Sequence, residues 1–229
     1  MRFTQTDIDA LLEAWPRLRR QPSVRGDAYI LAGPLTFSMS PPGLPTLEDT
    51  YNIRIDVPMG PTELAPDVYE EGGRIPRDVH HHVYDSGALC LGSPWTIRQH
   101  LGQPASLVKL VEQCVVPFLY AATWREQGGT GYPFDDLAHG AAGLLEDYES
   151  ILGLTGSEAV ILAFQALRRR RREANRLPCP CGCRRRLGRC SYRFKLVTLR
   201  KGTTKSFFSG LLYQISKAYP PTERAGRSR

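Results

Sequence analysis

The stretch TYNIRIDV, residues 50–57, decides the fold class of this chain. Its apolar and polar side chains alternate, which is the pattern of a strand with one buried face in an antiparallel sheet. β-rich runs at 28–32 and 35–40 precede it, and a weaker one follows around Val68 and Tyr69. Gly-Pro, PPGLP and PMGP segments separate the runs. The pattern predicts a four-stranded antiparallel meander.

Helices are predicted on both sides of this strand-rich region. Residues 4–15 carry apolar side chains at helical spacing and acidic residues near the start. Residues 107–122 form a wide apolar stripe that Pro117 should kink, and residues 135–152 predict a further helix. His139 falls off the apolar stripe of that helix, where it could face solvent or an active site. The chain is therefore expected to be α+β.

A third helix after the strands is predicted to begin at Thr155, because Thr155 and Glu158 have the spacing of a capping box. It should run into five consecutive arginines at 168–172, which would cover the whole circumference of a helix and cannot all face a core. These arginines could meet nucleic-acid phosphates, an acidic protein surface or the acidic part of this chain. They could also form a solvated helix end whose charges complement the helix dipole.

The net charge of +7 conceals a division along the chain. Residues 1–166 carry 11 Lys and Arg against 21 Asp and Glu, a balance of −10, whereas residues 167–229 carry 19 against 2, a balance of +17. We expect either two modules with different partners or a basic segment that folds back on an acidic body. Nucleic-acid binding by the basic half is one function that this division allows.

Length and composition favour a protein with an ordinary core. The 229 residues, 41% of them hydrophobic, suffice for one domain with an appendage or for two small domains. We find no apolar run close to the roughly 20 residues that cross a bilayer, and no signal-peptide pattern. Four of the six cysteines crowd into residues 179–190, which fits a reducing compartment. We expect a cytoplasmic protein without a membrane partner.

The four crowded cysteines lie in the segment PCPCGCRRRLGRC. Four thiolates can hold one Zn²⁺ tetrahedrally, and basic loops with glycine supply turns and offset the negative charge. Three of the cysteines alternate, which is not the usual ligand spacing, so redox-active or unliganded thiols are the alternative. We expect a structural Zn²⁺ on Cys179, Cys181, Cys183 and Cys190.

This segment resembles the small zinc-binding SEC-C motif. In that motif Cys-Pro-Cys-Gly is followed by a basic stretch and then by a cysteine and a Cys or His. Cys179, Cys181 and Cys190 match the order, whereas Cys183 and Ser191 depart from it. The resemblance therefore leaves the fourth ligand open.

The C-terminal region is predicted to form a strand over 192–199 and a helix over 203–218. The apolar side chains of that helix need a partner surface, which we expect on the first domain or on another chain. We divide this half into a connecting helix with the arginine run at 154–177, a zinc-motif unit at 178–219 and a disordered tail at 220–229.

A different cysteine, Cys90, lies in HHHVYDSGALCL, residues 80–91. A cysteine nucleophile reacts as its thiolate, so it needs partial exposure and neighbours that stabilise negative charge. The histidines and the polar residues between them and Cys90 are candidates for that role. The alternative is that Cys90, between Leu89 and Leu91, is a small buried hydrophobe at the end of a strand.

The order of helix, meander, cysteine-bearing loop and helices over residues 1–153 resembles the ubiquitin-conjugating enzyme fold. In that family a His-Pro-Asn triplet precedes the catalytic cysteine by a fixed interval, with a glycine between them and a leucine after the cysteine. The positions that match are His80, His81 and His82 for the triplet, Gly87, Cys90 and Leu91, with Gly33-Pro34 before the second strand and Trp95 after the cysteine. Two departures are His81 in place of the proline and His82 in place of the asparagine.

The resemblance implies that Cys90 accepts the C-terminus of a ubiquitin-like protein from an activating enzyme and passes it to an amine. His82, or else His80, would stabilise the oxyanion, while Tyr84, Asp85 or His139 would orient or deprotonate the incoming nucleophile. Such divergence is similar to that of bacterial proteins found beside ubiquitin-like modifiers, activating enzymes and deconjugating metalloproteases, some of them in antiphage defence.

Three other functions remain open from the sequence. The conjugating fold could be catalytically silent and act as a binding platform. The basic half could make this a nucleic-acid-binding protein. The three histidines could form a metal site with Cys90, although adjacent side chains in an extended chain point to opposite faces.

Overall fold

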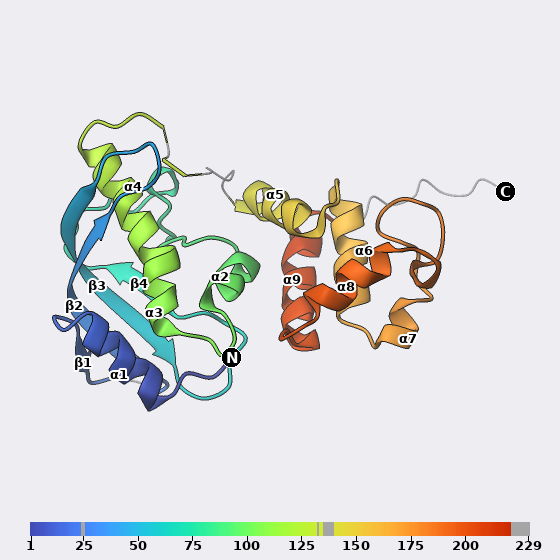
Figure 1. Ribbon diagram of the computed structural model, residues 1–229, viewed down its shortest axis with the longest axis horizontal. Coiled ribbons are helices and arrows are strands. Elements are labelled where there is room, and N and C mark those ends of the chain that lie inside the picture. Colours follow the sequence, from blue (N-terminus) through green and yellow to red (C-terminus); the bar gives the residue numbers. More distant parts are fainter. Residues whose placement is uncertain (24–25, 132, 135–139, 221–229) are drawn as a thin grey trace. The chain divides into compact units, whose positions relative to one another are not determined.

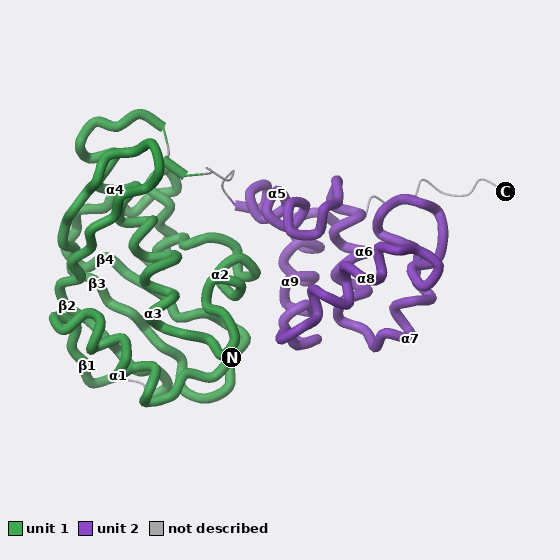
Figure 2. Tube along the Cα trace, viewed as in Figure 1, with its two compact units in different colours: residues 1–136 green, residues 137–229 purple. Residues whose placement is uncertain are grey.

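The computed structural model describes residues 1–23, 26–131, 133–134 and 140–220. The chain divides into two compact units, unit 1 (Met1–Asp136) and unit 2 (Leu137–Arg229), drawn in different colours in Figure 2. This division falls earlier than the boundary expected at residue 153, because the helix that ends at Leu152 packs against helices of unit 2. The tail expected at 220–229 lies outside the described residues except for Pro220.

Unit 1 contains the predicted four-stranded antiparallel meander, with the strands adjacent in chain order (Figure 1). The strands are β1 (Arg19–Gln21), β2 (Ala28–Met39), β3 (Leu47–Pro58) and β4 (Asp67–Glu70). The alternation along β3 is confirmed, since its apolar side chains are buried in the core: Tyr51, Ile53, Ile55 and Val57. The fold is therefore α+β with an antiparallel sheet.

The strand boundaries around Gly33-Pro34 differ from the prediction. The two runs on either side of this pair form the single strand β2, and the first strand of the meander is β1, which the sequence did not indicate. Gly33 has a φ of +143°, and a Cβ there would lie 2.5 Å from the carbonyl oxygen of Arg17. The glycine thus allows the segment before β1 to approach the sheet closely without interrupting β2.

Helices cover one side of this sheet, where α1, α3 and α4 lie together in Figure 1. Helix α1 (Gln5–Ala14) begins with a capping box between Thr4 and Asp7. The predicted apolar helix runs from Leu107 to Glu126 as α3 (Leu107–Leu110), a π-helical turn (Val111–Val115) and α4 (Val116–Glu126). The wide turn lies directly before Pro117, whose ring cannot continue a regular hydrogen-bond ladder.

That helix corrects one expectation about membranes. Leu107–Glu126 is long and apolar enough to cross a bilayer, whereas the sequence was expected to contain no such run; more than half of its most apolar window is buried inside the protein. In unit 2, Gly140–Leu152 and Ser157–Leu167 pass the same test only as a pair bent by 63°. Helices that form the core of a water-soluble domain satisfy these criteria too.

In the described part of unit 2 the regular elements are helices, joined by turns and one small hairpin. The elements of unit 2 are α5 (Gly140–Leu152), α6 (Ser157–Leu167), α7 (Arg171–Ala174), a 3-10 turn (Leu187–Arg189), α8 (Tyr192–Leu199) and α9 (Lys205–Ala218). Helix α9 packs against α5 and α6. The apolar side of α9 therefore finds a partner on α6 and on α5, a helix that the sequence-based division had counted in the first domain.

Residues 192–199 form helix α8, so the predicted strand is wrong. The residues alternate in polarity over a short distance, but the structure buries only Leu196 fully and leaves Phe194 exposed on the opposite side. The Thr198 hydroxyl donates to the carbonyl of Phe194, one helical turn earlier. Since the only sheet in the described residues belongs to unit 1, this segment lacks a neighbouring strand with which to pair.

The helix predicted from Thr155 through the arginine run is also shorter than expected. It begins at Ser157 with Gly156 as its N-cap, and no side chain forms the predicted capping bond. Its last residue is Leu167, after which the chain turns and Arg170 adopts an extended conformation before the short helix α7. Arg168, Arg169 and Arg170 therefore lie on a turn between two helices, and Arg171 and Arg172 begin α7, so the five arginines do not surround one helix.

Candidate functional site

Cys90 lies in a loop that is hydrogen-bonded to the edge strand of the sheet. The amide of Leu89 donates to the carbonyl of Val68 at 2.7 Å, and Ala88 forms an antiparallel bridge with Tyr69. The amide of Cys90 donates to the carbonyl of His82, also at 2.7 Å. These bonds fix the backbone of the cysteine relative to both β4 and the histidine segment.

The histidine segment is a short 3-10 turn (Val79–His81) that Asp78 caps at its N-terminal end. His82 follows with φ 54° and ψ 43°, a left-handed conformation in which His, Asn and Asp are enriched among non-glycine residues. His81 Nδ1 lies 2.8 Å from the Asp78 carboxylate, and this hydrogen bond lowers the pKa of Asp78. Arg125 donates to the carbonyl of His80 at 2.6 Å.

The thiol of Cys90 is partly exposed and receives a hydrogen bond from the Tyr84 hydroxyl at 3.1 Å. The Tyr84 side chain is about half exposed, but desolvation around its hydroxyl and the bond to Cys90 raise the pKa of Tyr84, so the phenol stays protonated and can donate at neutral pH. A tight turn brings the two side chains together: the amide of Gly87 donates to the Tyr84 carbonyl, and Gly87 has a φ of +85°. A donor directed at sulfur stabilises a thiolate.

Cys114, on the buried π-helical turn, illustrates the opposite environment. Its side chain is 5% exposed, and desolvation raises the pKa of its thiol to about 12. A neutral, buried thiol of this kind is chemically inert. The two cysteines of unit 1 therefore lie in different environments, and Cys90, which is partly exposed, is not a fully buried hydrophobe.

The remaining candidate residues of unit 1 have no described side-chain contact with the sulfur of Cys90. Asp85 is exposed in the turn, and the described contacts do not join it to Cys90. His139 lies outside the described residues. Within the described ranges, the histidines and Cys90 do not form a metal-binding group. Arg77 was not predicted from the sequence; its guanidinium would lie 3.6 Å from a Cβ at Gly87.

Unit 2 holds the second cluster of sulfur atoms. The ligand atoms of Cys179, Cys181, Cys183 and Cys190 all lie within 4.8 Å of one another. The Cys179–Cys181 and Cys181–Cys190 sulfur distances are 3.2 and 3.6 Å. Sulfur atoms bound at about 2.3 Å to one tetrahedral ion lie about 3.8 Å apart. The four thiols can therefore hold a metal ion, and the cluster is compatible with Zn²⁺.

A small hairpin creates this convergence. Pro178 pairs with Arg186, and the amide of Cys179 donates to the Arg185 carbonyl at 2.9 Å. Positive φ values at Gly182 (76°) and Arg184 (59°) turn the chain sharply between these residues. The alternating cysteines lie on this turn, so their side chains meet despite their unusual spacing.

The hydrogen bonds around the cluster resemble those that support bound thiolates. The backbone amide and side chain of Arg185 lower the pKa of Cys183 to about 6, and the amide of Tyr192 lowers the pKa of Cys190. Burial raises the pKa of Cys179, which disfavours an isolated thiolate at that position. Cys183 occupies the fourth corner, whereas Ser191 is the first residue before α8 and does not belong to the cluster.

Comparison of the whole chain with protein-family models, with curated proteins and with solved structures finds no match.

Proposed function

We propose that unit 1 is a divergent ubiquitin-conjugating-enzyme-like domain in which Cys90 carries a ubiquitin-like protein as a thioester. One observation carries the proposal: the partly exposed Cys90 sulfur accepts a hydrogen bond from Tyr84, while the Cys90 amide is bound to the carbonyl of His82. His82 stands at the last position of the histidine triplet in the resemblance. The four-stranded meander with flanking helices agrees with the same family.

The proposed reaction consists of two acyl transfers. The Cys90 thiolate attacks the thioester carbonyl on an activating enzyme, a new S–C bond forms, and the thiolate of that enzyme departs. An acceptor amine then attacks the Cys90 thioester and loses a proton, and the Cys90 thiolate departs. Tyr84 would stabilise the thiolate before the first step and after the second.

The histidines would contribute to the oxyanion that develops in each transfer. His82 holds the triplet position of the family asparagine, and its left-handed backbone is one that asparagine also adopts readily. The ring of His82, or else that of His80, would donate a hydrogen bond to the oxyanion. Asp85, exposed in the neighbouring turn, would orient or deprotonate the amine, a role for which His139 is the other candidate.

In unit 2 we propose a structural Zn²⁺ on the four cysteines. The ion would cross-link the hairpin to the start of α8 and take no part in acyl transfer. Four thiols within 4.8 Å of one another can bind a metal ion or, with an oxidant, form disulfides, and a reducing cytoplasm, our expected compartment, favours the metal. Activating enzyme, modifier and a deconjugating metalloprotease are the partners we expect, encoded by neighbouring bacterial genes, with antiphage defence as one such setting.

Charging with the activating enzyme and modifier that we expect to be encoded by neighbouring genes tests the proposal on a non-reducing gel. We expect an adduct that a thiol reductant removes, and none with Cys90→Ala. Cys90→Ser should yield an adduct that the reductant leaves intact, because an oxygen ester resists thiol exchange.

Cys114→Ala is the matched control, since it removes the other thiol of unit 1 and should charge normally. A reducible adduct that persists in Cys90→Ala would refute the assignment of the nucleophile. Normal biological function of Cys90→Ala would instead favour a binding platform.

A further inference from the structure

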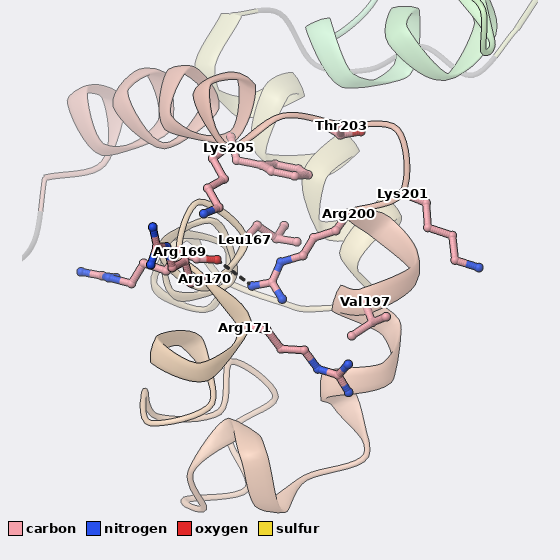
Figure 3. A pocket seen from close by; sticks show the side chains of 10 residues that line it. Leu167, Arg169, Arg170, Arg171, Val197, Arg200, Lys201, Thr203 and Lys205 are labelled. Atoms are coloured by element: carbon pink, nitrogen blue, oxygen red, sulfur yellow. Dashed lines mark hydrogen bonds between the residues drawn. The ribbon is translucent and has the colours of Figure 1, made fainter.

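A cavity of about 510 Å³ opens in unit 2 between the end of α6, the arginine turn (Arg169, Arg170 and Arg171) and the connection from α8 to α9 (Figure 3). Cavities of this size fall within the range that binds small molecules in proteins. The lining residues are Leu167, Arg169, Arg170, Arg171, Val197, Arg200, Lys201, Thr203, Lys205 and Phe208. Six of these side chains are cations, and none of the ten is a carboxylate.

The fold itself brings these cations together. Because α6 stops at Leu167, the arginines leave the helix and turn across one side of the cavity. Helix α8 ends at Leu199, directly before Arg200 and Lys201, and α9 begins at Lys205. Figure 3 shows Arg200 and Lys205 extending toward the arginine turn from the opposite side. Residues distant in sequence thus concentrate positive charge around one cavity.

Arg200 forms the inner wall of the cavity. Its guanidinium donates to the carbonyl of Ala166 at 2.6 Å and to that of Arg169 at 3.4 Å, which satisfies the exposed carbonyls at the end of α6. Its Nε is buried and lacks a hydrogen-bond partner within the described part of the chain. Burial and the nearby charge of Arg171 lower the pKa of Arg200. An anion in the cavity could accept a hydrogen bond from the unpaired Nε and would offset the unfavourable burial of the Arg200 charge beside Arg171.

The other five cations of the lining form no ion pair within the described ranges. Glu173 is the single acidic residue between 167 and 220. Like charges held this close repel one another unless a counter-charge is bound. The lining therefore favours an anionic ligand with several acceptor oxygens.

The chemistry of the lining selects phosphate over peptide carboxylates. Apart from the Thr203 hydroxyl, its polar side chains are donors only, which matches a group that carries acceptors only. Arginine forks bind phosphate oxygens in pairs, and a phosphate carries more charge than a carboxylate. An acidic peptide would also bring backbone N–H groups, for which the side chains of the lining supply almost no acceptor.

We propose that this cavity binds the phosphate groups of a nucleotide, either free or within a single-stranded nucleic acid. The apolar floor of Leu167, Val197 and Phe208 would lie beneath the less polar part of the ligand. This site is separate from Cys90 and does not depend on the proposed acyl transfer.

Titration of the full-length protein with ATP, with a fluorescein-labelled ten-nucleotide oligothymidine and with an octaglutamate peptide tests the proposal at about 50 mM salt. The pocket variant combines Arg170→Gln, Lys201→Gln and Lys205→Gln, three exposed residues. We expect ATP or the oligonucleotide to bind, and the pocket variant to weaken that binding about tenfold or more. Binding of ATP alone identifies a free nucleotide, and binding of the oligonucleotide alone identifies a strand.

A control variant with the same loss of charge combines Arg172→Gln, Arg176→Gln and Lys217→Gln, which are exposed in unit 2 but do not line the cavity. It should change affinity by less than about twofold. Equal weakening in both variants would mean diffuse attraction rather than a site, and would overturn the proposal. So would failure of both phosphate probes to bind, or equally tight binding of octaglutamate.

Discussion

Cys90 and the cysteine cluster place sulfur in two contrasting settings. In unit 1 a sheet and its covering helices form the hydrophobic core, and Cys90 is not part of that core. Its sulfur lies on a loop beside the edge strand and accepts a hydrogen bond from one hydroxyl, that of Tyr84. In unit 2 four sulfurs meet at the centre of a hairpin, with arginines around them. The first arrangement leaves a thiol accessible for reaction, whereas the second would consume its thiols in holding the structure together.

The largest expected effect is on the stability of unit 2. Cys190 is 4% exposed and contributes one of the four sulfurs, so Cys190→Ser should release the metal and unfold the hairpin and α8, a loss of several kcal/mol. Metal content and limited proteolysis would measure this. Unit 1 should resist digestion, and Cys90→Ser should retain the metal. An equally metal-rich, protease-resistant Cys190→Ser protein would argue against a metal centre.

The next effect separates the two steps proposed for Cys90. His82→Ala should slow discharge of a preformed thioester to an amine by about a hundredfold, roughly 2.7 kcal/mol in activation free energy, because an oxyanion donor is lost. Charging should slow less, since the activating enzyme supplies its own groups. Single-turnover discharge measures the difference, with His100→Ala, an exposed histidine of unit 1, as the control. Equal rates in both variants would remove His82 from the reaction.

A third prediction concerns the charged network that stabilises unit 1 independently of any metal. Arg74 donates to both oxygens of Asp49, at 3.0 and 2.8 Å, and this pairing, helped by bonds from Thr50 and Thr123, lowers the pKa of Asp49 from 3.8 to about 2. Because the folded-state pKa lies below the unfolded one, the stabilisation is complete above about pH 4, declines below that pH, and is lost as the pH falls through about 2.

Partial exposure of the Arg74 side chain screens this pair, so we expect it to contribute about 1 kcal/mol. Unfolding of unit 1 by denaturant should show Asp49→Asn less stable than the native chain at pH 6, and the difference should shrink as the pH falls through about 2. A difference between the two proteins that stays constant over this range would mean that packing, not charge, accounts for the loss.

The two regions also differ in how far their structure followed from sequence. Alternation in β3 predicted the sheet because burial of one face imposes a period of two on the side chains. Strand β1 escaped notice because all three of its residues are exposed, so only pairing with β2 makes it a strand. In α8 only Leu196 is fully buried, and one buried residue cannot produce the apolar spacing of 3.6 residues by which a helix is predicted.

The candidate sites were predicted as sets of residues rather than as geometries. Convergence of the four sulfurs depends on left-handed residues at Gly182 and Arg184, and cysteine spacing alone could not establish it. The contact between Tyr84 and Cys90 likewise depends on the turn at Gly87. The basic cavity forms because α6 ends before the arginines. The single continuous helix that the sequence predicted would not have placed them around a cavity.

The smallest expected effect tests the feature that distinguishes Cys90 from the cluster, its single hydroxyl partner. Tyr84→Phe keeps the ring that partly shields the sulfur but removes the hydrogen bond, so alkylation of the Cys90 thiolate at neutral pH should slow by about threefold to tenfold. Peptide-resolved mass spectrometry follows Cys90 apart from the other thiols. Tyr213→Phe, an exposed tyrosine of α9, should leave the rate unchanged. If Tyr84→Phe reacts as fast as the native chain, the hydroxyl does not stabilise the thiolate, and the reactivity of Cys90 must come from its backbone position beside His82.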